Sequence, residues 1–206
     1  MTVQSGRRER KKAATRQKIA DTALRLFLEH GYDAVGIRDV AAEADVAVTT
    51  LFSHFASKEA LVFEQEEDFE RRLTQAVTGR APQEPLIPAL RREILALVRH
   101  CTADSAAPIW RMIDASPALR RYDESIRLRH ADALATAIAA DPDRTRSETA
   151  ARTIARFVID AYSLAREAAD PEAALDEIFP MIEAAWQVTC PSASGRRDSE
   201  GPQPRA

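Results

Sequence analysis

Small polar and methyl-bearing side chains are concentrated between residues 48 and 54, and they are the side chains best suited to reading another molecule. A threonine hydroxyl can hydrogen-bond a nucleic-acid base edge or a phosphate, and the methyl groups of threonine and valine fit against the methyl group of thymine. The residues concerned are Val48, Thr49, Thr50, Ser53 and His54. Their chemistry predicts recognition of a DNA groove, and the alternative is an ordinary polar helix surface.

Two short helices joined by a turn are needed to present these side chains. In the first helix, apolar residues recur at i, i+3 and i+4, at Ile37, Val40 and Ala41. Residues 43–46 supply a short turn, and in the second helix, residues 48–55, Leu51 and Phe55 face inward four positions apart. Two short helices at a steep angle, the second exposing small polar side chains, are typical of a helix-turn-helix that fits the major groove.

The ends of these helices carry residues suited to anions. Gly36 begins the first helix and leaves backbone N–H groups free to meet a phosphate. Ser57 can cap a further helix after the motif, and Lys58 then lies at a helix N-terminus, which itself attracts anions.

The same stretch resembles the DNA-binding signature of the tetracycline-repressor (TetR) family over about residues 13–62. The resemblance is carried, without gaps in spacing, by Gly31, Tyr32, Val40, Ala41, Val46, Thr50, Leu51, Phe52, Ser53, His54, Phe55, Ser57, Lys58 and Glu59. Ala47 stands where the family usually has a capping Ser, and Asp45 and Thr49 stand where it usually has Gly. Phe52 replaces a common Tyr, so a phenol hydroxyl that would hydrogen-bond a phosphate is missing.

The resemblance implies that His54 and Lys58 contact phosphates and that the partner is double-stranded DNA with a pseudo-palindromic operator. The predicted DNA-binding residues are Gly36, Arg38, Val48, Thr49, Thr50, Phe52, Ser53, His54 and Lys58. The resemblance further implies a homodimeric repressor that a small-molecule effector releases from its operator. The alternative is a helical ligand-binding or interaction protein that has lost specific DNA binding.

Composition favours an all-α fold of about nine helices. Gly is scarce, at 6 of 206 residues, while Ala, Leu, Glu and Arg are abundant, and no stretch alternates with the period of a strand. No apolar run approaches the roughly 18 residues that a membrane helix requires. The two cysteines do not form a CxxC pair, which favours a reduced, cytoplasmic protein.

The net charge of −3 hides a strong asymmetry along the chain. Basic residues crowd the N-terminus against a single acid, Glu9, and they are Arg7, Arg8, Arg10, Lys11, Lys12, Arg16 and Lys18. We expect residues 1–12 to be a disordered basic arm, either a solubilising tail or an arm that lies on phosphates or in the minor groove. Domain boundaries are expected after residues 12, 62 and 190, with a regulatory domain at 63–190 and a disordered tail at 191–206.

Caps and prolines set the expected helix boundaries. Helix-forming patterns begin with residues 13–30 and 58–78, on either side of the helix-turn-helix, and prolines 82, 85 and 88 then interrupt the chain. The body helices are expected to begin near 86, 108, 117, 147 and 171.

Aromatic and polar residues on neighbouring body helices predict a small-molecule pocket. The candidate ligand-binding residues are Trp110, Met112, Tyr122, His130 and Phe157. Aromatic walls with one or two polar groups suit such a site, and ordinary core packing is the alternative for each of them. We expect no metal site, because adjacent His100 and Cys101 point about 100° apart on a helix. The chain also lacks a Gly-rich phosphate loop and a nucleophile elbow, so we expect neither an enzyme nor a cofactor.

The helix expected at 147–168 carries two apolar stripes, and we expect the subunit to cover one of them. The second stripe and the last helix then predict a dimer interface made of Ala151, Ala155, Val158, Tyr162, Ile178, Ile182 and Trp186. Two copies related by a two-fold axis would bury these surfaces in a four-helix arrangement.

Overall fold

The computed structural model of the chain describes residues 3–64, 66–81, 83–103, 106–141 and 147–188. Every regular element in these ranges is helical, so the expectation of an all-α fold with nine α-helices is confirmed. The elements are α1 (Val3–His30), α2 (Ile37–Glu43), α3 (Val48–His54), the 3-10 helix η1 (Glu59–Leu61), α4 (Glu66–Thr78), α5 (Leu86–Cys101), α6 (Ala107–Ala115), α7 (Pro117–Ala139), α8 (Glu148–Glu167) and α9 (Pro171–Val188).

Local sequence signals account for several helix ends. Gly31 takes φ +89° and donates its N–H to the Phe27 carbonyl at 2.9 Å, which ends α1. Ser116 accepts a backbone N–H at the start of α7, where Pro117 is the first helical residue. Ser147 caps α8 in the same way.

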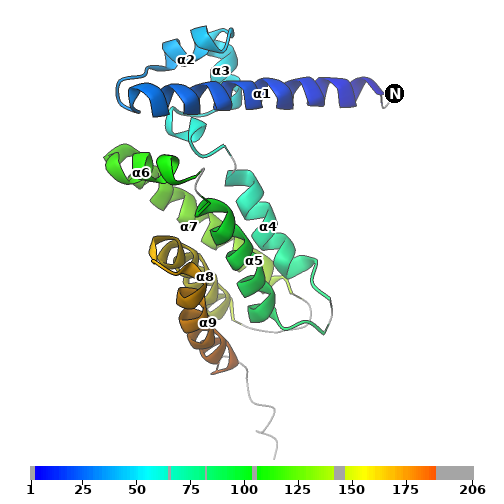
Figure 1. Ribbon diagram of the computed structural model, residues 1–206. Helices are drawn as coiled ribbons and strands as arrows, with labels where there is room; N and C mark the ends of the chain where they lie inside the picture. Colours follow the sequence, from blue (N-terminus) through cyan, green and yellow to red (C-terminus); the bar gives the residue numbers. More distant parts are fainter. Residues whose placement is uncertain (1–2, 65, 82, 104–105, 142–146, 189–206) are drawn as a thin grey trace, which may run out of the picture.

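The helices form two groups (Figure 1), and the buried side chains form two hydrophobic cores. We call residues 3–64, which contain α1 to α3 and η1, the head, and residues 66–188 the body. The head core also takes in Ile113 of α6 and Leu119 of α7, so the body is packed directly against it. The body core joins α4, α5, α7, α8 and α9. In the described ranges, no helix is both long and apolar enough to cross a membrane.

The N-terminal part of the chain differs from the expectation. We expected residues 1–12 to be disordered, but α1 begins at Val3 and its first turns project past the rest of the head (Figure 1). The expected helix at 58–78 is also divided, into η1 and α4. The tail expected at 191–206 lies outside the described residues.

The apolar stripe of α8 that we assigned to the dimer interface is buried inside the subunit, so the expectation that it would stay exposed is wrong. Ala151, Ala155 and Val158 are at most 1% exposed. The physical reason is that α5, α7 and α9 all pack against α8 and together cover the side that carries these residues. Ile182 and Trp186 are buried as well, while Tyr162 and Ile178 are half-buried.

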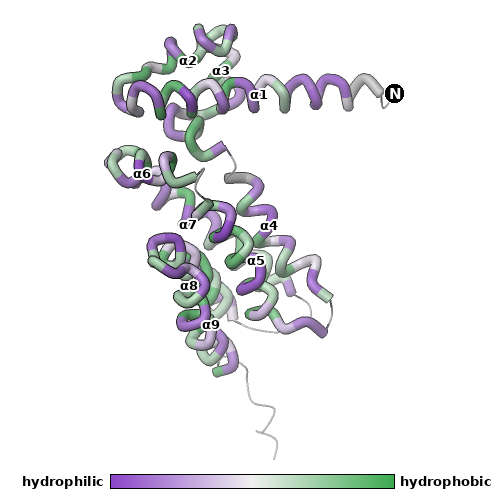
Figure 2. Tube along the Cα trace, viewed as in Figure 1, coloured by the Kyte–Doolittle hydropathy of each residue, from purple (hydrophilic) through white to green (hydrophobic). Residues whose placement is uncertain are grey.

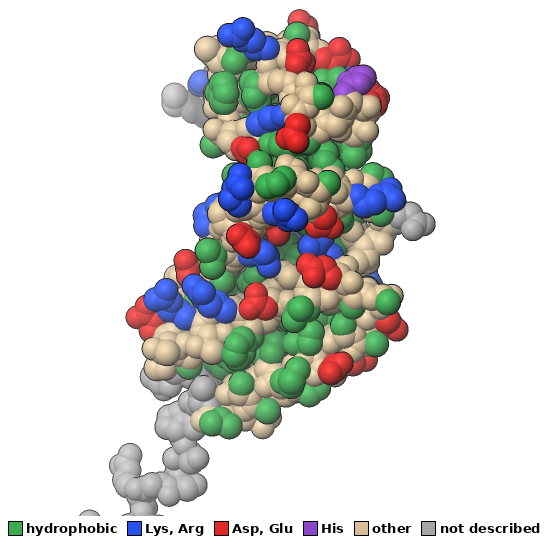
Figure 3. Space-filling model, turned by 90° about the vertical axis from the view of Figure 1, so that its left-hand side faces the viewer, with side chains coloured by type: hydrophobic (Ala, Val, Ile, Leu, Met, Phe, Trp, Pro, Cys, Tyr) green, Lys and Arg blue, Asp and Glu red, His purple; other side chains and the backbone are tan. Residues whose placement is uncertain are grey.

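A different apolar strip remains exposed on the last two helices. It consists of Phe157 and Leu164 on α8 and Met181 and Val188 on α9, which are between 44% and 85% exposed. Figure 3 shows apolar side chains gathered on the lower part of this side of the molecule. We refer to these four residues as the α8–α9 strip.

Candidate DNA-binding surface and ligand pocket

Helix α3 is held in the head by its buried side and presents a mixed polar side to solvent. Leu51 is fully buried beneath it. Thr49, Phe52 and Ser53 are exposed, and Phe52 is 50% exposed despite its size. Val48, Thr50 and His54 are half-buried, and Val48 packs against the head core. The exposed face is therefore narrower than the sequence pattern predicts.

The turn between α2 and α3 tolerates the replacement of the glycine that is usual in the family. Asp45 takes φ +52°, in the left-handed region. Glycine enters this region freely, and Asp is among the few other residues that enter it regularly. Val46 then donates its N–H to the Ala41 carbonyl at 2.9 Å, which closes the turn.

Arg16 of α1 ties the end of α3 to the head. Its guanidinium donates to the His54 carbonyl, lies 4.4 Å from the centre of the Phe55 ring and is 3.6 Å from the Glu64 carboxylate. Burial lowers the pKa of His54, and the positive charges of Lys12 and Arg16 lower it further. Both effects favour the neutral form of the His54 imidazole.

Lys58 has partners within the head. Its ammonium donates to the Tyr32 carbonyl and lies 4.1 Å from the centre of the Tyr32 ring. The Tyr32 hydroxyl in turn donates to the Glu59 carboxylate at 3.0 Å. Burial lowers the pKa of Lys58, against the opposing effects of Asp33 and Glu59. Lys58 immediately precedes a short 3-10 helix rather than beginning the long helix expected here. Because its ammonium is already engaged with Tyr32, phosphate binding would require the side chain to leave these contacts.

The two remaining predicted DNA-binding residues lie at the start of α2, where Gly36 and Arg38 are both exposed. Gly36 begins the helix as expected, but its N–H donates to the Asp39 carboxylate at 2.8 Å. That N–H is therefore already occupied, contrary to the expectation that it would be free for a phosphate.

A groove of about 880 Å³ separates α3 from the first turns of α1. Its walls carry mainly basic and hydroxyl side chains, contributed by Arg8, Glu9, Lys11, Lys12, Thr15, Thr50, Ser53 and His54. The DNA-binding residues predicted from the sequence include none from α1, although the basic arm at residues 1–12 was expected either to be a solubilising tail or to lie on phosphates or in the minor groove. The α1 side of the groove could have been recognised from the sequence, because one helix face carries residues at i, i+3, i+4 and i+7, namely Arg8, Lys11, Lys12 and Thr15.

Comparison with known proteins identifies the head. Residues 19–64, from α1 through η1, match the family model described as "Bacterial regulatory proteins, tetR family". The head is a TetR-family domain. Among curated relatives, the transcriptional repressor KstR of Rhodococcus jostii is 47% identical over 57 residues, which are 27% of each chain. The match spans between about a quarter and a third of the length of the curated relatives.

Solved structures extend the likeness of fold to the body. A TetR-family regulator from Streptomyces coelicolor superimposes with a TM-score of 0.62 at 17% identity, covering 84% of this chain and 94% of that one. SmeT in complex with triclosan gives a TM-score of 0.57 at 19% identity, covering 93% of this chain and all of the other. At these identities the likeness shows that the TetR fold extends across head and body.

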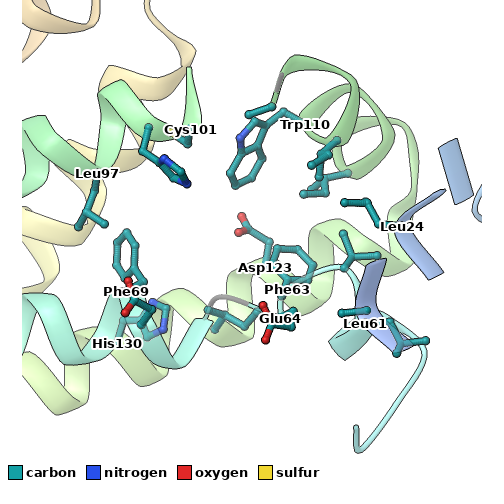
Figure 4. Close-up of a pocket in the computed structure, with 18 of the residues that line it drawn as sticks. Leu24, Leu61, Phe63, Glu64, Phe69, Leu97, Cys101, Trp110, Asp123 and His130 are labelled. Carbon is teal, nitrogen blue, oxygen red and sulfur yellow. The ribbon is translucent and has the colours of Figure 1, made fainter. Parts of the chain in front are cut away.

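A cavity of about 770 Å³ lies where the head meets the body. Helix α1 contributes Gln17, Asp21 and Leu24, and the other walls come from residues 61–64 and from α4 to α8. Figure 4 shows the aromatic rings of Phe63, Phe69 and Trp110 around this space. The cavity is therefore bounded by the DNA-binding head as well as by the body.

The predicted ligand-binding residues divide into three groups. Trp110 and His130 line the cavity as expected. Met112 and Tyr122 do not line it: Met112 packs against the head core, and the Tyr122 ring lies 5.4 Å from that of Phe63. Phe157 is 44% exposed on α8, so its placement in the pocket is wrong.

Other lining residues were missed by the sequence prediction, on α7 and on α8. Helix α7 presents Asp123, Ile126 and Arg127 to the cavity in place of Tyr122. Tyr162, expected at a dimer interface, also lines it, and its ring lies 4.8 Å from that of Phe69. Phe69 in turn stacks on His130 with ring centres 4.7 Å apart.

The carboxylate of Asp123 lies among the aromatic side chains of the cavity. Asp123 points toward Trp110 in Figure 4, and its Oδ2 lies 3.3 Å from Arg127 Nε. Burial raises the pKa of the Asp123 carboxyl, while Arg127 and Arg166 act in the opposite direction. Arg166 also lies 4.0 Å from the centre of the Trp110 ring, which braces that wall from α8. The arrangement suits a ligand with an apolar body and one hydrogen-bonding group.

Proposed function

We propose that the protein is a cytoplasmic, homodimeric DNA-binding repressor that a small apolar effector releases from its operator. The observation that carries this proposal is the TetR-family head, whose α3 leaves Thr49, Phe52 and Ser53 exposed. The family is one of regulatory proteins, so we assign no enzymatic activity. The repressor KstR, similar over 27% of its length, supports repression as the direction of control.

Helix α3 is the proposed recognition helix. It is short enough to enter a major groove, and the threonine hydroxyl and methyl groups can read base edges there. The test is to let the purified protein select duplexes from a random-sequence DNA pool. We expect enrichment of a two-fold-related sequence. If no sequence is enriched, the alternative of a protein without specific DNA binding is favoured.

Replacing Thr49 with Ala is expected to weaken binding to the selected duplex by about 1–3 kcal/mol, because an exposed base contact is lost. Fluorescence anisotropy on the selected and an unselected duplex measures the effect. Thr149→Ala, at an exposed position near the start of α8, is the control and should leave both affinities unchanged. An equal loss on both duplexes would mean that Thr49 does not read bases.

The proposed homodimer places the α8–α9 strip of one subunit against that of its partner. Four large apolar side chains on adjacent helices favour burial, and a two-fold axis lets the same strip serve both subunits. Two recognition helices can then reach major grooves one turn apart, about 34–36 Å. This proposal keeps the two helices of the sequence prediction but replaces all of the predicted interface residues.

The cavity between head and body is the proposed effector site. Its volume of about 770 Å³ lies within the range usual for small-molecule sites. The neighbour SmeT carries triclosan, which supports a small aromatic ligand for this fold. Because α1 forms one wall, a bound ligand contacts the head directly. If the ligand binds more tightly when the head is in one position relative to the body than in another, ligand binding and DNA binding are coupled.

Effector binding should depend on Trp110. We expect a thermal-shift screen to identify a stabilising compound, beginning with triclosan and other small aromatic molecules. At a concentration of 100 times its Kd, such a ligand should raise the free energy of unfolding by about 2.7 kcal/mol. Trp110→Ala should reduce that stabilisation by weakening the ligand's affinity roughly tenfold or more, since an aromatic wall is lost. Leu128→Ala, exposed on α7 and outside the cavity, is the control. Equal ligand shifts in both variants would count against this cavity.

A further inference from the structure

The first turns of α1 form a basic helical extension of the head. Arg7, Arg8, Lys11 and Lys12 are all exposed, and α1 begins before them at Val3. Figure 2 shows this part of α1 as predominantly hydrophilic, and Figure 1 shows it reaching past α3. Because these residues are helical, each side chain has a defined direction, which a disordered arm would not provide.

The cations of this extension differ from most other arginines of the molecule. Elsewhere, arginines form ion pairs, as Arg25 does with Glu29 and Glu43, and Arg72 with Glu93. In the described part of the chain, Arg8, Lys11 and Lys12 form no salt bridge with a carboxylate. Three charges therefore remain close together without a counter-charge other than that of Glu9 in the same groove.

These unpaired cations face the recognition helix. Arg8, Lys11 and Lys12 form one wall of the groove whose other wall includes Thr50 and Ser53 of α3. The pKa of His54, the last residue of α3, is lowered first by burial and then by the positive charges of Lys12 and Arg16. Basic and hydroxyl groups thus form a continuous surface with the proposed base-reading face.

We propose that the groove face of the α1 extension is a second DNA contact, which binds backbone phosphates beside the segment read by α3. This inference rests on the proposed function of the head. Phosphates are the favoured partner because Lys and Arg neutralise them independently of sequence, and such contacts position a protein on the duplex. The ten residues Val3–Lys12 span about 15 Å at 1.5 Å per residue, roughly four base pairs of duplex.

The test compares two double variants that remove equal charge from the same turns of α1. The groove variant is Arg8→Gln with Lys12→Gln, and the control variant is Arg7→Gln with Arg10→Gln, whose side chains are exposed but do not line the groove. All four positions are exposed, so folding should be preserved, and circular dichroism checks this. Affinity for the duplex selected by the wild-type protein is measured by anisotropy between 50 and 200 mM salt.

We expect the groove variant to lose about 1.8 units of slope in log K against log[salt] for each bound subunit, since each phosphate contributes about 0.9. Over that fourfold range of salt, the wild-type affinity then falls about 12-fold further per subunit than that of the groove variant. The control variant should retain most of the wild-type slope. Equal slope changes in the two variants, or no change in either, would overturn the inference while leaving the proposed function standing.

A second measurement uses duplex length. Adding four base pairs to each end of the minimal selected duplex should raise the affinity of the wild-type protein and of the control variant but not of the groove variant. An equal gain in all three proteins would contradict the proposed contact. If the wild-type protein selects no duplex at all, the proposed function fails together with this inference, and that result differs from both outcomes above.

Discussion

Replacing Val158 with Asp is expected to unfold the subunit rather than separate two folded subunits. Val158 is fully buried, and α5, α7 and α9 pack around its helix. An unpaired carboxylate there costs several kcal/mol, on the order of the 5–15 kcal/mol by which a whole domain is stable. Far-UV circular dichroism and urea denaturation should show loss of cooperative helical structure.

Val158→Ala provides the matched comparison, because it removes apolar volume without adding charge. We expect it to remain folded and to lose about 1–3 kcal/mol of unfolding free energy. A folded, monomeric Val158→Asp protein with wild-type stability would show instead that this residue lies at an interface between subunits.

The double variant Leu164→Asp with Met181→Asp is expected to split the dimer and leave the subunits folded. Both side chains are more than half exposed in the subunit, so the carboxylates remain hydrated in the monomer but would be buried and repelled in a two-fold interface. Light scattering at micromolar concentration should give half the wild-type mass. Affinity for the selected duplex should fall by roughly 100-fold or more, because the two half-sites are no longer bound together.

Leu128→Asp is the control for this second prediction. Leu128 is 50% exposed on α7 and lies outside the α8–α9 strip, so the same change of chemistry there should leave the mass and the DNA affinity unchanged. Persistence of the wild-type mass in the Leu164→Asp/Met181→Asp protein would exclude the strip as the interface.

Most helices and the head motif were predictable from the sequence because their causes are local. Gly31 ends α1 by taking a positive φ, and Ser116 with Pro117 begins α7, as short-range hydrogen bonds and ring geometry require. The helix-turn-helix was predictable for the same reason, since a four-residue turn and two short apolar patterns lie within about twenty residues.

Tertiary structure decided which faces of these helices are free, because that depends on how many neighbours each helix has. The pattern on α8 correctly indicated two apolar sides but not which of them the subunit covers, and the candidate interface therefore moved from Val158 to Leu164. Packing of α7 against its neighbours likewise placed Asp123 rather than Tyr122 in the cavity. The residues near the N-terminus were recognisable as basic from the sequence alone. Their role as one wall of a groove depends on a helix that continues past α3, and this placement arises from packing between segments distant in the chain.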